Sequence, residues 1–226
     1  STIKEILADY HPGYSNEDLL AFYMVTGGVA KYVELLVINE AFTKAAILNT
    51  MFRENSFFLN EGRDVLIEEF GKEYGNYFSI LSLIASSKND RSSMESVLNF
   101  NLIKRIRPFM AKEGSRNNRY KIEDNFLNFW FRFNYKYRSA IEITNFDYVR
   151  DIVERDYETY SRIILEKYFQ QQLIESKQYS DIQGYWDSKG ENEIDIVAIN
   201  ERDKRLEFYE VKRNPDKISL EVLKRK

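Results

Sequence analysis

The sequence predicts an α+β protein with several domains, and two patterns lead to this prediction. Apolar residues recur at the spacing of one helix face in four segments, 16–24, 29–39, 74–85 and 157–173. Three later runs are rich in β-branched and aromatic residues and are typical of strands, 182–186, 192–199 and 206–212. With 226 residues, the chain is long enough for one large domain or for two to three small ones.

Residues 1–53 are expected to form a small helical domain. Ser15 is a suitable N-cap for a helix with acidic residues in its first turn, and Gly27 and Gly28 are expected to end it. A second helix is expected over 29–39. This region has no strand of its own, so we expect it to pack on another part of the chain.

Residues 54–143 combine a core helix at 74–85 with a strand, a basic turn and a second strand within 102–122. That hairpin is typical of the wing of a winged helix. Asp124 is a suitable N-cap for the next helix, which is dense in aromatic residues. The aromatic density favours a packing role between domains for residues 126–137.

The hairpin 102–122 is locally basic, with Glu113 as the one acid between Lys104 and Lys121. Clusters of lysine and arginine of this kind bind the phosphate groups of nucleic acids. The alternative is a solvated hairpin, because basic turns are common. The predicted nucleic-acid contacts are Lys104, Arg105, Arg107, Lys112, Arg116 and Arg119.

The region 144–226 carries the strongest chemical signal. Side chains alternate between the two faces of a strand, so Glu193 and Asp195 share one face, and Glu210 and Lys212 share another. Charges inside otherwise apolar strands are costly unless they are paired or bind a metal. Asp195 and Glu210 are therefore candidate Mg²⁺ ligands, and Lys212 is a candidate to orient the attacking water or to stabilise charge on phosphorus. The alternative is an exposed Glu-Lys ion pair of little energetic value.

The composition excludes several kinds of functional site and bears on where the protein is found in the cell. The chain has no cysteine and a single histidine, His11, which excludes disulfides and thiolate metal sites and argues against a Ser-His-Asp triad. It has neither an apolar run long enough to span a membrane nor a signal-peptide pattern, so we expect a cytoplasmic protein. The net charge of −3 leaves any DNA binding to local basic patches.

The last region resembles the PD-(D/E)XK superfamily, whose fold is that of restriction endonucleases. In that superfamily a helix acid precedes the D…ExK strands. Glu166 matches the helix acid, Asp195 the middle acid, and Glu210 with Lys212 the ExK, while Glu193 is an accessory match. The resemblance implies that Glu166, Asp195 and Glu210 hold Mg²⁺ or Mn²⁺ and that Lys212 completes the catalytic set.

Nearly the whole chain resembles the C-terminal half of a bacterial and archaeal AAA (STAND-type) ATPase family. The segments that carry this resemblance are 22–32, 119–133, 185–187 and 193–198, in that order. The resemblance implies a further P-loop ATPase domain as a partner in the same parent chain. The domains that it implies here are a helical lid at 1–53, a winged-helix-like domain at 54–143 and an α/β restriction-endonuclease-like domain at 144–226.

Two features depart from that family. The sequence lacks the G-x-x-x-x-G-K-[ST] loop, so ATP would bind only to a missing N-terminal half, and this chain would not hydrolyse ATP alone. The winged helix is too short for its recognition helix, which leads to the hypothesis that residues are missing near Val97 to Asn101. A last helix is expected after Pro215 and reaches the final residue, Lys226, so we expect an incomplete C-terminus.

Three functions are compatible with these patterns. The first is a Mg²⁺-dependent hydrolase that cleaves DNA and also binds it through the winged helix. The second is a catalytically inactive nuclease-fold module that binds DNA or a protein under the control of the ATPase half. The third is an interaction scaffold in which the aromatic helix fixes the domains and no nucleic acid is involved. The oligomeric state is not readable from the sequence.

Overall fold

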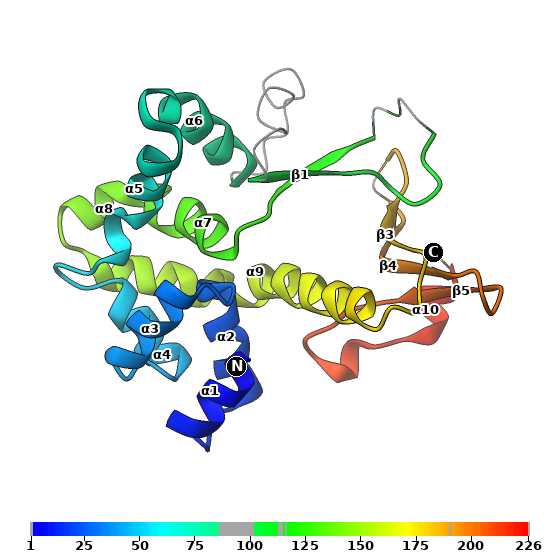
Figure 1. Cartoon of the computed structure of the whole chain (residues 1–226), viewed down its shortest axis with the longest axis horizontal. Helices are drawn as coiled ribbons and strands as arrows, with labels where there is room; N and C mark the ends of the chain where they lie inside the picture. Colours follow the sequence, from blue (N-terminus) through cyan, green and yellow to red (C-terminus); the bar gives the residue numbers. More distant parts are fainter. Residues whose placement is uncertain (1, 86–101, 113–114, 116, 190, 226) are drawn as a thin grey trace. The chain divides into compact units, whose positions relative to one another are not determined.

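The computed structural model describes residues 2–85, 102–112, 115, 117–189 and 191–225 (Figure 1). Helices dominate and the strands form two small sheets, so the predicted α+β class is confirmed. The helices are α1 (Ile3–Tyr10), α2 (Asn16–Thr26), α3 (Ala30–Ile38), α4 (Lys44–Met51), α5 (Phe58–Phe70), α6 (Tyr74–Ala85), α7 (Asn125–Phe129), α8 (Arg138–Glu142), α9 (Phe146–Glu175) and α10 (Leu220–Arg225). The strands are β1 (Ile103–Ile106), β2 (Arg119–Ile122), β3 (Asp181–Trp186), β4 (Glu193–Asn200) and β5 (Arg205–Tyr209).

The chain divides into two compact units, and α9 runs from the first into the second. The predicted boundaries between three domains stay predictions, because one compact unit can hold more than one domain. Unit 1 is Ser1–Lys104 with Lys121–Tyr157, and unit 2 is Arg105–Tyr120 with Glu158–Lys226.

The N-terminal helices begin and end where their local sequence predicts. The Ser15 hydroxyl accepts a hydrogen bond from the Asp18 N–H, and the Asp18 carboxylate accepts one from the Ser15 N–H. This capping box starts α2. Gly27 ends the helix with a φ of 58°, a left-handed conformation that costs glycine little. The predicted helices over 16–24 and 29–39 are both confirmed.

Aromatic side chains fill the core of unit 1. The Asp124 carboxylate accepts the Leu127 N–H and caps α7, as predicted, and α7 continues into a π-helix at Trp130–Tyr135. The Trp130 indole donates to the Leu59 carbonyl and lies so close to Gly62 that a Cβ there would be 2.2 Å from the ring. The aromatic segment packs inside unit 1, and its predicted role between domains stays a prediction. The largest fully buried aromatic residues are Phe22, Phe52, Phe58, Phe126, Phe129, Phe131 and Phe133.

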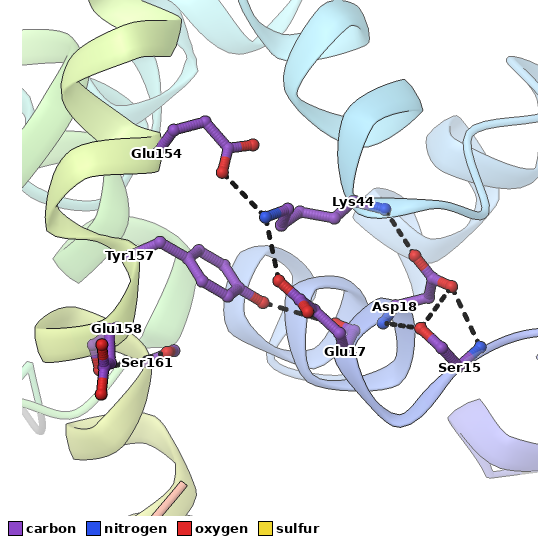
Figure 2. A network of polar contacts seen from close by, with 8 residues as sticks. All are labelled: Ser15, Glu17, Asp18, Lys44, Glu154, Tyr157, Glu158 and Ser161. Carbon is purple, nitrogen blue, oxygen red and sulfur yellow. Dashed lines mark hydrogen bonds and ion pairs between the residues drawn. The ribbon is translucent and has the colours of Figure 1, made fainter. Parts of the chain in front are cut away.

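Lys44 connects three helices of unit 1 through its backbone N–H and its ammonium group (Figure 2). The Lys44 N–H donates to the Asp18 carboxylate at 2.8 Å, and its ammonium pairs with Glu17 at 2.9 Å and Glu154 at 2.8 Å. Burial alone would lower the pKa of Lys44, but its bonds to Glu154 and Glu17 raise it overall. The Tyr157 hydroxyl also donates to the Glu17 carbonyl. These contacts join α2, α4 and the first half of α9.

The main sheet of unit 2 is antiparallel, with the strand order β3-β4-β5. Strand β4 is the central strand, and its residues Ile194 to Ala198 are buried. Ile196 lies opposite Tyr209 and Val197 opposite Phe208, so the pairing of the two charged strands is the predicted one. The register of β3 shifts between Gln183 and Tyr185, which leaves the Gly184 carbonyl to accept the Phe109 N–H at 2.8 Å.

Several predicted segments differ from the structure or lie outside it. α9 begins at Phe146, well before the predicted start at Tyr157. The helix predicted after Pro215 is α10, and an unpredicted 3-10 turn at Pro215–Lys217 precedes it. Arg116 and the stretch Val97 to Asn101, where missing residues were hypothesised, lie outside the described residues. Within the described ranges, no helix combines the length and the apolarity needed to cross a membrane.

Candidate functional site

Asp195 is the buried centre of the candidate site. Its side chain points from the middle of β4 and is 4% exposed. Its Oδ2 accepts the Val211 N–H at 2.7 Å. Burial raises the pKa of Asp195, and the neighbouring Glu210 charge raises it further. The Val211 N–H, Lys212 and Arg162 act in the opposite direction without cancelling the rise in pKa. A cation at this carboxylate would therefore relieve an unfavourable buried charge.

The ExK residues follow the last strand rather than lying in it, which corrects the predicted strand 206–212. β5 ends at Tyr209, because the next buried N–H, that of Val211, donates to the Asp195 side chain instead of continuing the ladder with β4. Glu210 and Lys212 still lie side by side, as their spacing of two residues predicted, because the Lys212 ammonium pairs with the Glu210 carboxylate at 2.5 Å. Both are largely buried, with side chains 12% and 26% exposed, so the exposed ion pair considered from the sequence is not what forms.

Glu166 reaches the same site from α9, through an arginine that the sequence reasoning missed. Arg162 Nε lies 3.6 Å from Glu166 Oε1, and Arg162 Nη1 lies 3.9 Å from Asp195 Oδ1. The spacing of four residues between Arg162 and Glu166, which places them on one face of a helix, was the signal that could have identified the pair. The contact to Asp195 joins residues distant in the sequence and left no local signal.

The predicted metal ligands do not form one closed cluster. Within the part of the chain that the structure describes, no three His, Cys, Asp or Glu side chains lie together as a metal site requires. Asp195 and Glu210 are close enough to affect each other's charge, whereas Glu166 joins Asp195 through the Arg162 guanidinium. The donor atoms are carboxylate oxygens, which suit Mg²⁺ and Mn²⁺.

The basic residues of the hairpin 102–122 have different surroundings. Lys104 lies 3.9 Å from Glu123, and Arg119 pairs with Glu193 at 2.5 Å while its guanidinium stacks 4.3 Å from the Trp186 ring. Exposed side chains that form no ion pair with another described residue are those of Arg105, Arg107 and Lys112. Four of the six predicted contacts, Lys104 among them, are thus exposed to solvent, whereas Arg119 is engaged inside unit 2.

The chain is similar to archaeal and bacterial proteins. A family model for archaeal and bacterial proteins of unknown function, DUF234, matches residues 130–221. That range includes Glu166, Asp195, Glu210 and Lys212. The chain is also 28% identical over 227 residues to an uncharacterized protein, MJECL04, of Methanocaldococcus jannaschii. The match covers 91% of this chain and 50% of that protein, so the chain spans about half the length of its relative. No solved structure matches.

Proposed function

We propose that unit 2 carries a metal-dependent site that hydrolyses phosphodiester bonds in DNA, of the PD-(D/E)XK type. The observation that supports it best is the convergence of Asp195, Glu210 and Lys212 where the β4–β5 ladder ends. These residue types at one sheet end fit the chemistry of phosphodiester cleavage, in which carboxylates hold a cation and a lysine faces the developing negative charge.

The chemistry of the donors fits a divalent cation. Asp195 is a buried carboxylate beside a second carboxylate, Glu210, and burial holds its pKa above the usual range. Asp195, Glu210 and Glu166 would hold the cation, which when bound would polarise the phosphate and lower the pKa of a bound water. Lys212 would orient the attacking water or stabilise charge on the phosphate, since Glu210 already fixes its ammonium.

The test is calorimetric titration of the chain with Mn²⁺, followed by cleavage assays on plasmid and single-stranded DNA with the same samples. We expect binding and cleavage in the native chain and the loss of both in Asp195→Asn. The control is Asp203→Asn, which changes an acid of the same unit in the turn before β5. Mn²⁺ binding that persists unchanged in Asp195→Asn would refute this site.

A second candidate is a binding module without catalysis, and the position of Arg162 favours it. Its guanidinium lies between Glu166 and Asp195, where a cation would be needed. In that case the chain would bind DNA or a protein without a metal ion and without cleaving its partner. DNA binding without any effect of Mn²⁺ on affinity or cleavage is the result expected from it.

We also propose the wider architecture that the sequence suggested, a helical lid and a winged-helix-like domain beside a nuclease-like domain, in the C-terminal half of an AAA-type ATPase. The helical residues 1–53 and the β1–β2 hairpin are compatible with its first two parts, and the relative, about twice as long as this chain, leaves room for a further domain. Absence of ATP hydrolysis by this chain, together with hydrolysis by the complete parent protein, is the expected outcome of an ATPase assay.

A further inference from the structure

We propose that Arg162 is the resident counter-ion of the acidic site, and that a divalent cation must displace its guanidinium to bind. This inference rests on the proposed metal-dependent function and names the residue that regulates loading of the metal. The native chain would then bind metal more weakly than its acidic residues alone allow.

The position of Arg162 on α9 makes it a bridge between acids from two elements. It lies one helical turn before Glu166, and its guanidinium reaches across to the Asp195 carboxylate on β4. The side chains of Glu166 and Asp195 are 13% and 4% exposed, while that of Arg162 is 42% exposed. The arginine can therefore swing into solvent without disturbing a packed core, and the two acids cannot.

The contacts of Arg162 are loose compared with those of the neighbouring lysine. Its nitrogen atoms lie 3.6 Å and 3.9 Å from the carboxylate oxygens, longer than charge-assisted hydrogen bonds of about 2.7–2.9 Å. Lys212 by contrast pairs with Glu210 at 2.5 Å. Of the two cations beside Asp195, Arg162 is the one that can be displaced at low cost.

Arg162 and a metal would meet the same electrostatic need. Asp195 is buried beside Glu210, so its charge is unfavourable unless a cation lies nearby. A divalent cation would supply that charge and would repel the guanidinium at the same carboxylates. Binding of the metal and the ion pairs of Arg162 therefore compete for Glu166 and Asp195.

The experiment is calorimetric titration of the whole chain with Mn²⁺, comparing Arg162→Gln with the native residue. Removal of two partly exposed ion pairs should tighten Mn²⁺ binding by roughly five- to twentyfold. Arg162→Lys, which keeps the charge but shortens its reach, should give an intermediate affinity. The matched control is Arg205→Gln, because Arg205 also pairs with two acids of unit 2, Asp203 and Glu207.

Each outcome bears on the proposal. Tighter binding in Arg162→Gln, with Arg205→Gln unchanged, supports it, since a merely structural loss would weaken binding. Unchanged or weaker binding in folded Arg162→Gln overturns it while the metal site stands. If Arg162→Gln does not fold, Arg162→Lys with native affinity overturns it and with tighter binding supports it. No Mn²⁺ binding in any variant overturns the proposed function and, with it, this inference.

Discussion

At the scale of single residues, Asp195 shows a conflict between stability and the proposed chemistry. Its carboxylate is buried, and its pKa is raised by that burial and by Glu210, so the charged form is unfavourable in the folded protein. One oxygen of the same carboxylate, Oδ2, accepts a hydrogen bond from the Val211 N–H, which would otherwise be a buried donor without a partner. A residue that served only the fold would accept this hydrogen bond without carrying a charge.

This conflict predicts opposite effects for two substitutions of Asp195. Asp195→Asn removes the buried charge and keeps an oxygen acceptor for Val211, so the melting temperature should rise by about 2–4 °C, as expected for roughly 1 kcal/mol in a chain of this size. Asp195→Ala removes the acceptor and should lower stability by about 1–3 kcal/mol. Differential scanning calorimetry in EDTA measures both effects. Equal destabilisation by the two variants would contradict the prediction that the buried charge of Asp195 destabilises the fold.

The residues of the candidate site also show where sequence reasoning succeeds and fails. Asp195, Glu210 and Lys212 stand out because charge interrupts apolar strands, and the structure brings all three together. Arg162 was missed because an arginine on a helix face is ordinary until the sheet places Asp195 beside it. The spacing of residues within one helix or strand can be read from the sequence, whereas contacts between elements depend on how the chain folds.

At the scale of elements, local signals located most helices well. The capping residues Ser15 and Asp124 act within three residues along the chain, so the helix starts that they predict are correct. The end of β5 was misplaced, because it is set by the Asp195 side chain from another strand. The π-helix at Trp130–Tyr135 was not predicted either, since packing of Trp130 against Gly62 involves a distant helix.

The hairpin 102–122 offers a test of structural against nucleic-acid roles. Arg119 stacks on Trp186 and pairs with Glu193, and Asn117 exchanges hydrogen bonds with Trp186. Arg119→Lys keeps the charge but loses the planar stacking, so it should lower stability by about 1 kcal/mol and leave DNA affinity unchanged. Urea denaturation followed by tryptophan fluorescence measures the first effect, and fluorescence anisotropy with labelled DNA measures the second.

The control for this prediction is Arg107→Lys, because the Arg107 side chain is exposed. That variant should leave the denaturation midpoint unchanged. A loss of DNA affinity in Arg119→Lys without a change in stability would instead make Arg119 a direct nucleic-acid contact, as the sequence alone suggested.

At the scale of the whole molecule, the net charge of −3 means that nucleic-acid binding depends on where the basic side chains lie. The exposed hairpin residues concentrate positive charge in one short stretch of unit 2. Substitution of Arg105, Arg107 and Lys112 together by glutamine should weaken duplex DNA binding. It should also reduce the slope of log K against log salt by about 2–3. Fluorescence anisotropy at several salt concentrations gives both the affinity and the slope.

The matched control removes the same number of charges from other exposed positions, with Lys4, Lys72 and Lys177 changed to glutamine. If the hairpin contacts phosphates, the slope falls in the first triple variant and stays near the native value in the control, because only displaced counterions contribute to it. Equal, small losses of DNA affinity in both variants would mean that binding depends only on the overall charge of the chain. DNA binding by neither the native chain nor its variants would favour the scaffold role, and the chemistry of Asp195 would then need a substrate other than DNA.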